Sequence, residues 1–347
     1  MTLAVQGDML GRKLAVTTLV AGLSLPLTGC FDLFPTPTPT PTFQRDDVSL
    51  QTPTSGLRVL GEKGQVMEMA DEVALDVNRW VAEMAVNFGE MLDELNAQPP
   101  RDVVDGWNIY GPHDAENGED ASWMARVSGD KDEVEFEVLV GERGASESEM
   151  VVLFTGNLAV DGESRSGGFT IDFDVISKLE ALQEDVGADT VAGQVRVDFS
   201  RGEKQDKDVT IEFVGFSYTN GRDGEDLDYK DETYVYHRET DGSGLFHFAS
   251  WAPFEDEGWS GPEYERVTVD MVWDADLAGR ARAQILEVEG EGDLRFGDVH
   301  LNECFDAGYS LTWANLNEPY ASDNSGYNEG DESACLLKES ALDAYEK

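Results

Sequence analysis

The 347-residue sequence has few cysteines, few histidines and few basic residues. It contains three cysteines, four histidines and 25 lysines and arginines, against 71 aspartates and glutamates. The formal net charge of −46 argues against nucleic-acid binding, because a field of that sign repels polyanions. No two of the histidines lie two to five residues apart, so the sequence lacks a local zinc motif; they are His113, His237, His247 and His300.

Long apolar runs and catalytic motifs are also missing. The uncharged apolar run at 14–27 has 14 residues, and a membrane-spanning helix needs about 20. The sequence has no Gly-x-Ser-x-Gly elbow and no phosphate-binding glycine loop. Carboxylates are so numerous that any chosen acid–base pair would be arbitrary. These absences predict a protein that is not an enzyme; a hydrolase of unrecognised type is the alternative.

The N-terminal residues form a recognisable export signal. Arg12 and Lys13 precede the apolar run, which ends in Leu27-Thr28-Gly29-Cys30, and a basic start before a short apolar run is typical of a secretory signal. The last four residues resemble the lipobox of bacterial lipoproteins. The resemblance implies that residues 1–29 are removed, that Cys30 carries lipid chains, and that a lipid bilayer is a partner. An ordinary signal peptide with a chance cysteine is the alternative.

The residues after Cys30 predict a spacer. Pro35, Pro37, Pro39 and Pro41 alternate with threonine, and proline fixes φ and disfavours helix, so the repeat favours polyproline II at about 3.1 Å per residue. We expect residues 30–61 to be a stalk and linker. In enterobacterial lipoproteins, an Asp directly after the lipidated cysteine resembles a mark for retention in the inner membrane. Phe31 occupies that position here. We therefore expect a lipid anchor in the cell envelope, at the outer membrane.

The remaining two cysteines, Cys304 and Cys335, predict a disulfide. An exported chain folds in an oxidising compartment, and an even number of cysteines remains once Cys30 is assigned to lipid. A metal pair is the alternative, but it lacks His or Cys companions at suitable spacing.

Two periodicities divide the rest of the chain. Apolar residues recur every three or four positions over 62–98 and predict one long amphipathic helix, ended by Pro99 and Pro100. From 107 to 347 the period becomes two, as in 134–140, 169–173 and 267–273, which predicts antiparallel strands with one buried face. We expect a helical interruption at 175–183.

These elements predict a mainly β fold with one long helix. An antiparallel meander of about ten strands would curl into a barrel or half-barrel, or split into two layers, with the helix packed on it. That shape resembles the lipoprotein-carrier proteins of the bacterial envelope in architecture only. The chain resembles uncharacterised envelope lipoproteins of myxobacteria and their relatives. The resemblance is carried by the lipobox, the stalk, the "SGGFTIDFD" hairpin and the C-terminal cysteine pair.

Two segments are candidate binding sites. An aromatic cluster around a Pro-Gly turn would form a recognition patch if exposed, or cap the end of the fold if buried; it comprises Phe248, Trp251, Phe254 and Trp259. An acidic loop offers weak calcium ligands, or only solvated carboxylates; its residues are Asp223, Asp226, Asp228 and Asp231. No other cofactor is expected.

The expected function is that of a membrane-anchored envelope lipoprotein with a structural or binding role. Its partner would be an unknown envelope protein. The alternative is a carrier or sensor of an apolar ligand or lipid held in the curled sheet.

Overall fold

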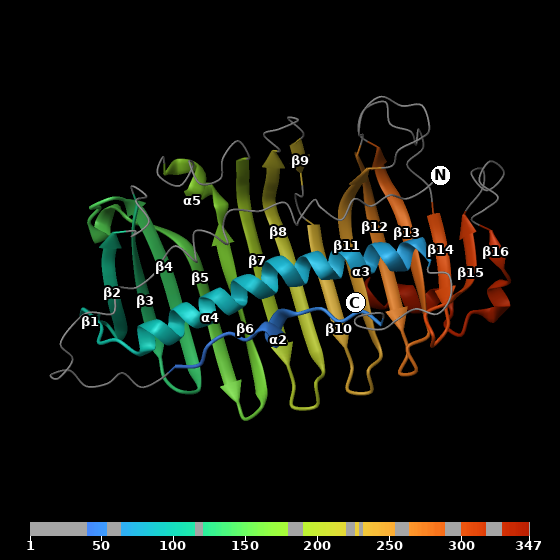
Figure 1. The fold of residues 1–347 in the computed structure, drawn as a ribbon, viewed down its shortest axis with the longest axis horizontal. Coiled ribbons are helices and arrows are strands. Elements are labelled where there is room, and N and C mark those ends of the chain that lie inside the picture. The colour runs from blue at the N-terminus through green and yellow to red at the C-terminus, as the bar shows by residue number, and fades with distance from the viewer. Residues whose placement is uncertain are drawn as a thin grey trace.

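The structure is a computed structural model that describes most of the chain after residue 39. The described residues are 40–53, 64–114, 121–179, 190–219, 226–228, 232–253, 264–288, 300–316 and 328–346. Within them lie one long helix, a short N-terminal helix and a single large sheet (Figure 1).

The predicted long helix is confirmed. It consists of α3 (Gln65–Val77), a π-helical turn η1 (Asn78–Ala82) and α4 (Glu83–Asn96), and its 32 residues span about 48 Å. The apolar stripe read from the sequence is the buried side: Val66, Ala70, Val73 and Val77 all lie against the sheet. None of the helices in the described residues is both long enough and apolar enough to cross a membrane.

The strands of the described residues form one antiparallel sheet of sixteen, rather than the ten expected. Each strand pairs with the next along the chain, except that the short β9 pairs only with β8. The expected count missed short strands such as β1 and β16, in which two or three residues carry no detectable alternation. The strands are β1 (Asp102–Val104), β2 (Trp107–Asp114), β3 (Ala121–Gly129), β4 (Glu133–Glu142), β5 (Val151–Asp161), β6 (Ser164–Asp172), β7 (Thr190–Arg201), β8 (Lys207–Thr219), β9 (Asp226–Asp228), β10 (Glu232–Arg238), β11 (Gly244–Pro253), β12 (Tyr264–Trp273), β13 (Gly279–Val288), β14 (His300–Phe305), β15 (Leu311–Leu316) and β16 (Glu329–Gly330).

The sheet is open, with β1 at one end and β16 at the other. It is therefore neither a closed barrel nor two layers, and the predicted class of a mainly β fold with a helix packed on the sheet is confirmed. The helix crosses the strands on one face and runs from β14 towards β1 (Figure 1). Alternating side chains such as Val195, Val197 and Phe199 are buried on that face.

The other face of the sheet is covered at its C-terminal end by the last residues of the chain. Cys304 of β14 forms the predicted disulfide with Cys335, which lies just after the 3-10 turn η5 (Glu332–Ala334). A second 3-10 segment, η6 (Glu339–Glu346), contacts β11, β12 and β13 and buries Leu342. The disulfide thus fastens this tail over the sheet. The helical interruption predicted at 175–183 corresponds in part to α5 (Phe173–Lys178); Leu179 is extended, and residues 180–183 lie outside the described residues.

Residues 40–53 correct the expectation of a linker from 30 to 61. This segment, which we call the strap, packs against the helix and the sheet and contains the short helix α2 (Arg45–Val48). Phe43, Val48 and Leu50 are each at most 4% exposed. Three apolar residues in fourteen are too few to give a recognisable period, so the sequence did not reveal that they are buried. Residues 30–39 and 54–61 of the expected linker lie outside the described residues.

The disulfide should contribute to stability, because it closes a loop across a sequence separation of 31 residues. We expect Cys335→Ser to lower the free energy of unfolding by about 3–4 kcal/mol, measured by urea denaturation under oxidising conditions. Reducing the wild-type protein should lower it by the same amount and leave the variant unchanged. An unchanged unfolding midpoint in both cases would contradict the prediction.

Candidate functional site: the strap and the basic row

Half of the residues of the two predicted binding sites lie outside the described residues, and Phe248 is the member whose side chain is described. It is fully buried, 5.7 Å from Tyr234 between ring centroids, so it belongs to the core and not to an exposed patch. Trp251 lies on β11, but its side chain is not described, and neither are Phe254 and Trp259. Cys30, the predicted lipid attachment, precedes the described residues.

The predicted calcium ligands are placed only in part. Asp226 and Asp228 belong to β9, without a described side chain, and Asp223 and Asp231 lie outside the described residues. Within the described residues no three His, Cys, Asp or Glu side chains are grouped so as to hold a metal ion. Calcium binding by the loop at 223–232 stays a prediction.

The most elaborate polar site in the described residues lies where the strap meets the sheet. Four basic residues stand in register on adjacent strands: Arg165 of β6 is opposite Arg201 of β7, Arg201 is opposite Lys207 of β8, and Lys207 is opposite Arg238 of β10. We call these four residues the basic row. In a chain with only 25 lysines and arginines, such a row concentrates positive charge at one edge of the helix-bearing face.

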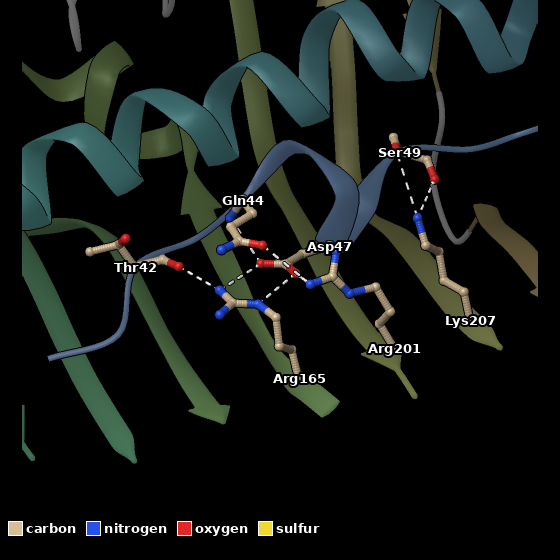
Figure 2. A network of polar contacts seen from close by, with 7 residues as sticks. All are labelled: Thr42, Gln44, Asp47, Ser49, Arg165, Arg201 and Lys207. Carbon is tan, nitrogen blue, oxygen red and sulfur yellow. Dashed lines mark hydrogen bonds and ion pairs between the residues drawn. The ribbon is translucent and has the colours of Figure 1, made fainter. Parts of the chain in front are cut away.

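The strap lies along the basic row, and the carboxylate of Asp47 compensates part of the positive charge of the row (Figure 2). The Asp47 side chain is completely buried. Its Oδ1 accepts from Arg165 Nε at 2.8 Å and its Oδ2 from Arg165 Nη2 at 3.0 Å, while Arg201 Nη2 lies 3.5 Å from Oδ1. Two-pronged arginine–carboxylate geometry of this kind is both strong and directional.

The same carboxylate also organises the strap itself. Asp47 Oδ2 accepts the backbone N–H of Gln44 at 2.8 Å at the start of α2, which is the reciprocal half of a capping box. Arg165 also donates to the carbonyl of Thr42, and Arg201 donates to Gln44 Oε1 at 3.2 Å (Figure 2). Asp47 therefore fixes the strap's local conformation and its position on the sheet at once.

The other two basic residues bind the strap further along. Lys207 Nζ donates to the carbonyl of Ser49 at 2.9 Å, and burial lowers the pKa of Lys207 to about 8, although the nearby carboxylates of Asp46 and Asp47 raise it. Arg238 donates to the side chain of Gln51, whose carbonyl accepts from the Tyr236 hydroxyl at 3.1 Å. The basic row thus contacts the strap from Thr42 to Gln51.

On its other side the strap is bound by the helix. Asn96 and Asn78 are 18 residues apart, which is about five helical turns and places them on one side of the helix. Asn96 donates to the Thr40 carbonyl at 3.3 Å and accepts from its hydroxyl at 3.1 Å. Asn78 accepts from the N–H of Leu50 at 2.6 Å and donates to its carbonyl at 2.8 Å. These contacts pair the strap antiparallel to the helix.

Apolar contacts complete the strap's attachment. The Phe43 ring packs edge-on against Phe136, Phe169 and Phe199, with centroids 5.5, 5.8 and 6.0 Å apart. Gly89 of α4 allows this approach, because a Cβ there would lie 2.4 Å from the carbonyl oxygen of Phe43. The strap is therefore part of the core and not a linker.

The other buried carboxylates each have a partner in the described structure. Asp270 binds His247 Nδ1 at 2.7 Å and Arg282 Nη2 at 2.9 Å on the opposite face of the sheet. Glu232 accepts from Arg266 Nε at 2.8 Å. These groups lie on different parts of the sheet and do not gather in one place.

Glu303 of β14 is a different case, because in the described residues its carboxylate binds backbone N–H groups instead of a basic side chain. It is 2% exposed and caps the start of the long helix, accepting backbone N–H groups of Gln65, Val66 and Met67 at 2.7, 3.0 and 3.3 Å. Gly64 precedes them, and a Cβ at that position would lie 2.2 Å from the Glu303 carboxylate. Burial raises the pKa of Glu303 to about 7, against the three N–H donors, which lower it.

The sequence alone did not predict that the four residues of the basic row lie side by side. Each member lies at the base of a turn cluster, as in "RGEKQDK", which contains Arg201 and Lys207. Exact hairpin registers would have placed the four side by side, but the register of strands with polar ends is weakly determined by sequence. Asp47 carries no signal of its own among 71 acidic residues.

Comparisons with known proteins give no match to this chain, whether with family models, curated proteins or solved structures.

Asp47 should be far more important for stability than its sequence neighbour. We expect Asp47→Asn to lower the free energy of unfolding by about 3–5 kcal/mol, because Arg165 and Arg201 lose their buried counter-charge. The matched control is Asp46→Asn, which removes the same charge from an exposed position of the same helix and should change stability by ~0.5 kcal/mol or less. Urea denaturation checks both, and equal losses would contradict the assigned role.

Glu303 should make stability depend on pH. Its pKa is raised in the folded protein from 4.5 to about 7, so its contribution is present below the unfolded pKa and is lost as the pH rises through about 7. Relative to Glu303→Gln, the wild-type protein should lose ~2–3 kcal/mol of stability between pH 5 and 8. Denaturation of both proteins across that range, with Glu329→Gln as an exposed control, measures it. A pH-independent difference would contradict the assignment.

Proposed function

We propose that the protein is a lipid-anchored, non-catalytic binding or structural protein of the cell envelope, held in the outer membrane through Cys30. The sequence from 27 to 30 supplies the lipobox, and the proline–threonine repeat connects it to the folded body. The partner of the body is an envelope protein.

The observation that carries the proposal is the attachment of the strap. Within the last residues of the proline–threonine repeat, at Thr40, the chain is already bound to the helix through Asn96. From there it is held along the whole basic row, with Asp47 buried between two arginines. A load applied through the anchor therefore passes to the centre of the sheet instead of to a loose terminus, as a tethered body requires.

A non-catalytic role is supported by how the buried acids are used. In the described residues Asp47, Asp270 and Glu232 pair with basic side chains, and Glu303 caps the helix. A hydrolase would instead gather carboxylates of separated pKa around one cleft. Each of these four groups has a structural use that accounts for its burial.

The carrier alternative receives less support. A carrier would hold its ligand against the apolar face of the sheet, and that face is packed with the protein's own helix and strap. Phe88 of the helix stacks on Phe154 of β5, and Trp80 stacks on Phe173. Admitting a lipid there would require displacing these rings.

The opposite, polar face of the central strands is the surface that the fold leaves available for binding. Thr155, Thr170, Arg196 and Glu212 stand in register across β5 to β8 and are at least partly exposed. Their neighbours along each strand point into the core. This flat polar band suits a protein partner that recognises hydrogen-bonding groups and charge.

The lipid anchor is tested by replacing its cysteine in the native host. Cys30→Ser should move the protein from the membrane fraction to the soluble fraction and abolish incorporation of labelled palmitate. Cys335→Ser is the matched control, because it removes a cysteine that forms a disulfide and should leave the protein in the membrane. Mass spectrometry of the mature wild-type chain should show residues 1–29 removed. Membrane association of the Cys30→Ser variant equal to wild type would overturn the proposal.

A further inference from the structure

An exposed apolar hairpin lies at one end of the sheet. Strands β1 and β2 are joined by Asp105 and Gly106, whose φ values of 51° and 89° form the tight turn that Asp-Gly favours in hairpins. Val103 and Val104 are 60% and 49% exposed, and Trp107 stands opposite Val104 in the register. We call residues 103–107 the β1–β2 tip. Adjacent exposed valines on a strand are unusual enough to require an explanation.

The tip is firmly supported, so its exposure does not come from a frayed strand. Trp107 packs against a small apolar cluster on the sheet's outer face, formed by Ile109, Met124, Leu139 and Met150. The backbone N–H of Arg101 donates to the Ile109 carbonyl at 2.7 Å, and the Arg101 guanidinium pairs with Glu147 at 3.2 Å. The valines are thus presented on a fixed base.

The tip and the start of the strap lie at the same end of the molecule. Thr40 is hydrogen-bonded to Asn96, and Val103 follows Asn96 by seven residues, which span at most about 25 Å. Ten residues separate Thr40 from Cys30, and a chain of that length reaches at most about 35 Å. A bilayer anchored at Cys30 is therefore within reach of the tip.

The other exposed apolar side chains are placed less favourably. Leu336 belongs to the tail that covers the β14–β16 end of the sheet, opposite the β1 end (Figure 1). Leu75 lies on the helix 21 residues before Asn96, about 30 Å along its axis. Val151, at 39% exposure, begins β5 and is in register through β4 and β3 with His113, at the end of β2 away from the tip. Among the large apolar residues exposed in the described structure, Val103 and Val104 are the pair beside the tether.

We propose that the β1–β2 tip docks on the membrane surface in which Cys30 is anchored, with both valines entering the headgroup region. This inference rests on the proposed lipid anchor. Apolar and tryptophan side chains are favoured at that depth. The chain's net charge of −46 selects lipids with uncharged or zwitterionic headgroups, because an anionic surface would repel the body. The docked tip would hold the sheet in one orientation relative to the bilayer.

A second copy of the chain fits the tip less well than a lipid surface. Strand β1 has only three residues, so edge-to-edge pairing would add few backbone hydrogen bonds, and two bodies of this charge repel each other. Contact with lipid needs no backbone pairing.

The experiment places a fluorescent label on the tip of the full-length lipidated protein. Val103→Cys is labelled with an environment-sensitive dye, and Leu75→Cys serves as the matched control because it is similarly exposed at 50%. With Cys30 acylated and Cys304 joined to Cys335, the introduced cysteine is the free thiol that reacts. Both proteins are reconstituted into phosphatidylcholine vesicles with or without nitroxide-bearing headgroups, and vesicle association is measured in the same samples by flotation.

Docking predicts that the label at 103 shifts to the blue and loses roughly half of its emission to the nitroxide lipid, while the label at 75 is little affected. Equal quenching at the two positions, with both proteins floating, would overturn the docking and leave the anchor intact. Shielding at 103 from both nitroxide lipid and aqueous iodide would mean that a protein covers the tip, which also overturns the docking. Failure of both proteins to float would overturn the proposed anchor and the docking together.

Discussion

The contact between Asp47 and the basic row is the interaction on which the rest of the structure depends. A carboxylate with no exposed surface must be matched by charge, and Arg165 and Arg201 supply it from two adjacent strands. Through this contact the strap is held between sheet and helix, and Phe43 reaches the aromatic core. Without it the apolar face beside Asn78 and Asn96 of the helix would be open to water, and the spacer would be joined to a free terminus.

The long helix has the second organising role, because it fills the face that a sixteen-stranded open sheet would otherwise expose. Both of its ends are set by neighbouring elements. Glu303 accepts the first backbone N–H groups at one end, and Asn96 binds the strap at the other. Glu303 of β14 thereby determines where the helix begins against the sheet. Gly64 is part of the same contact, because a Cβ at that position would collide with the Glu303 carboxylate.

Charge explains how so acidic a protein maintains this core. Most of the carboxylates in the described residues are exposed, where salt screens their repulsion, while several of the few basic residues are used at buried positions. Arg165 is 9% exposed, Lys207 8% and Arg280 3%; Arg280 pairs with Glu332 and lies over the Trp313 ring beside the disulfide. The scarce cations hold the strap to one face and the tail to the other, which leaves the central polar band and the β1–β2 tip as available surfaces.

The sequence by itself determined the long helix, the alternating strands, the mainly β class and the pairing of Cys304 with Cys335, because periodicity and cysteine number are local or countable properties. It did not determine the strand count, since strands of two or three residues such as β16 have no period, nor the burial of Phe248. Only the tertiary structure decided that residues 40–53 belong to the core and that Asp47 and Glu303 are buried, whereas most acids of the described residues are exposed. Those roles depend on strand register and on contacts between residues more than a hundred positions apart, as between Asp47 and Arg165. The amino-acid composition does not indicate such contacts.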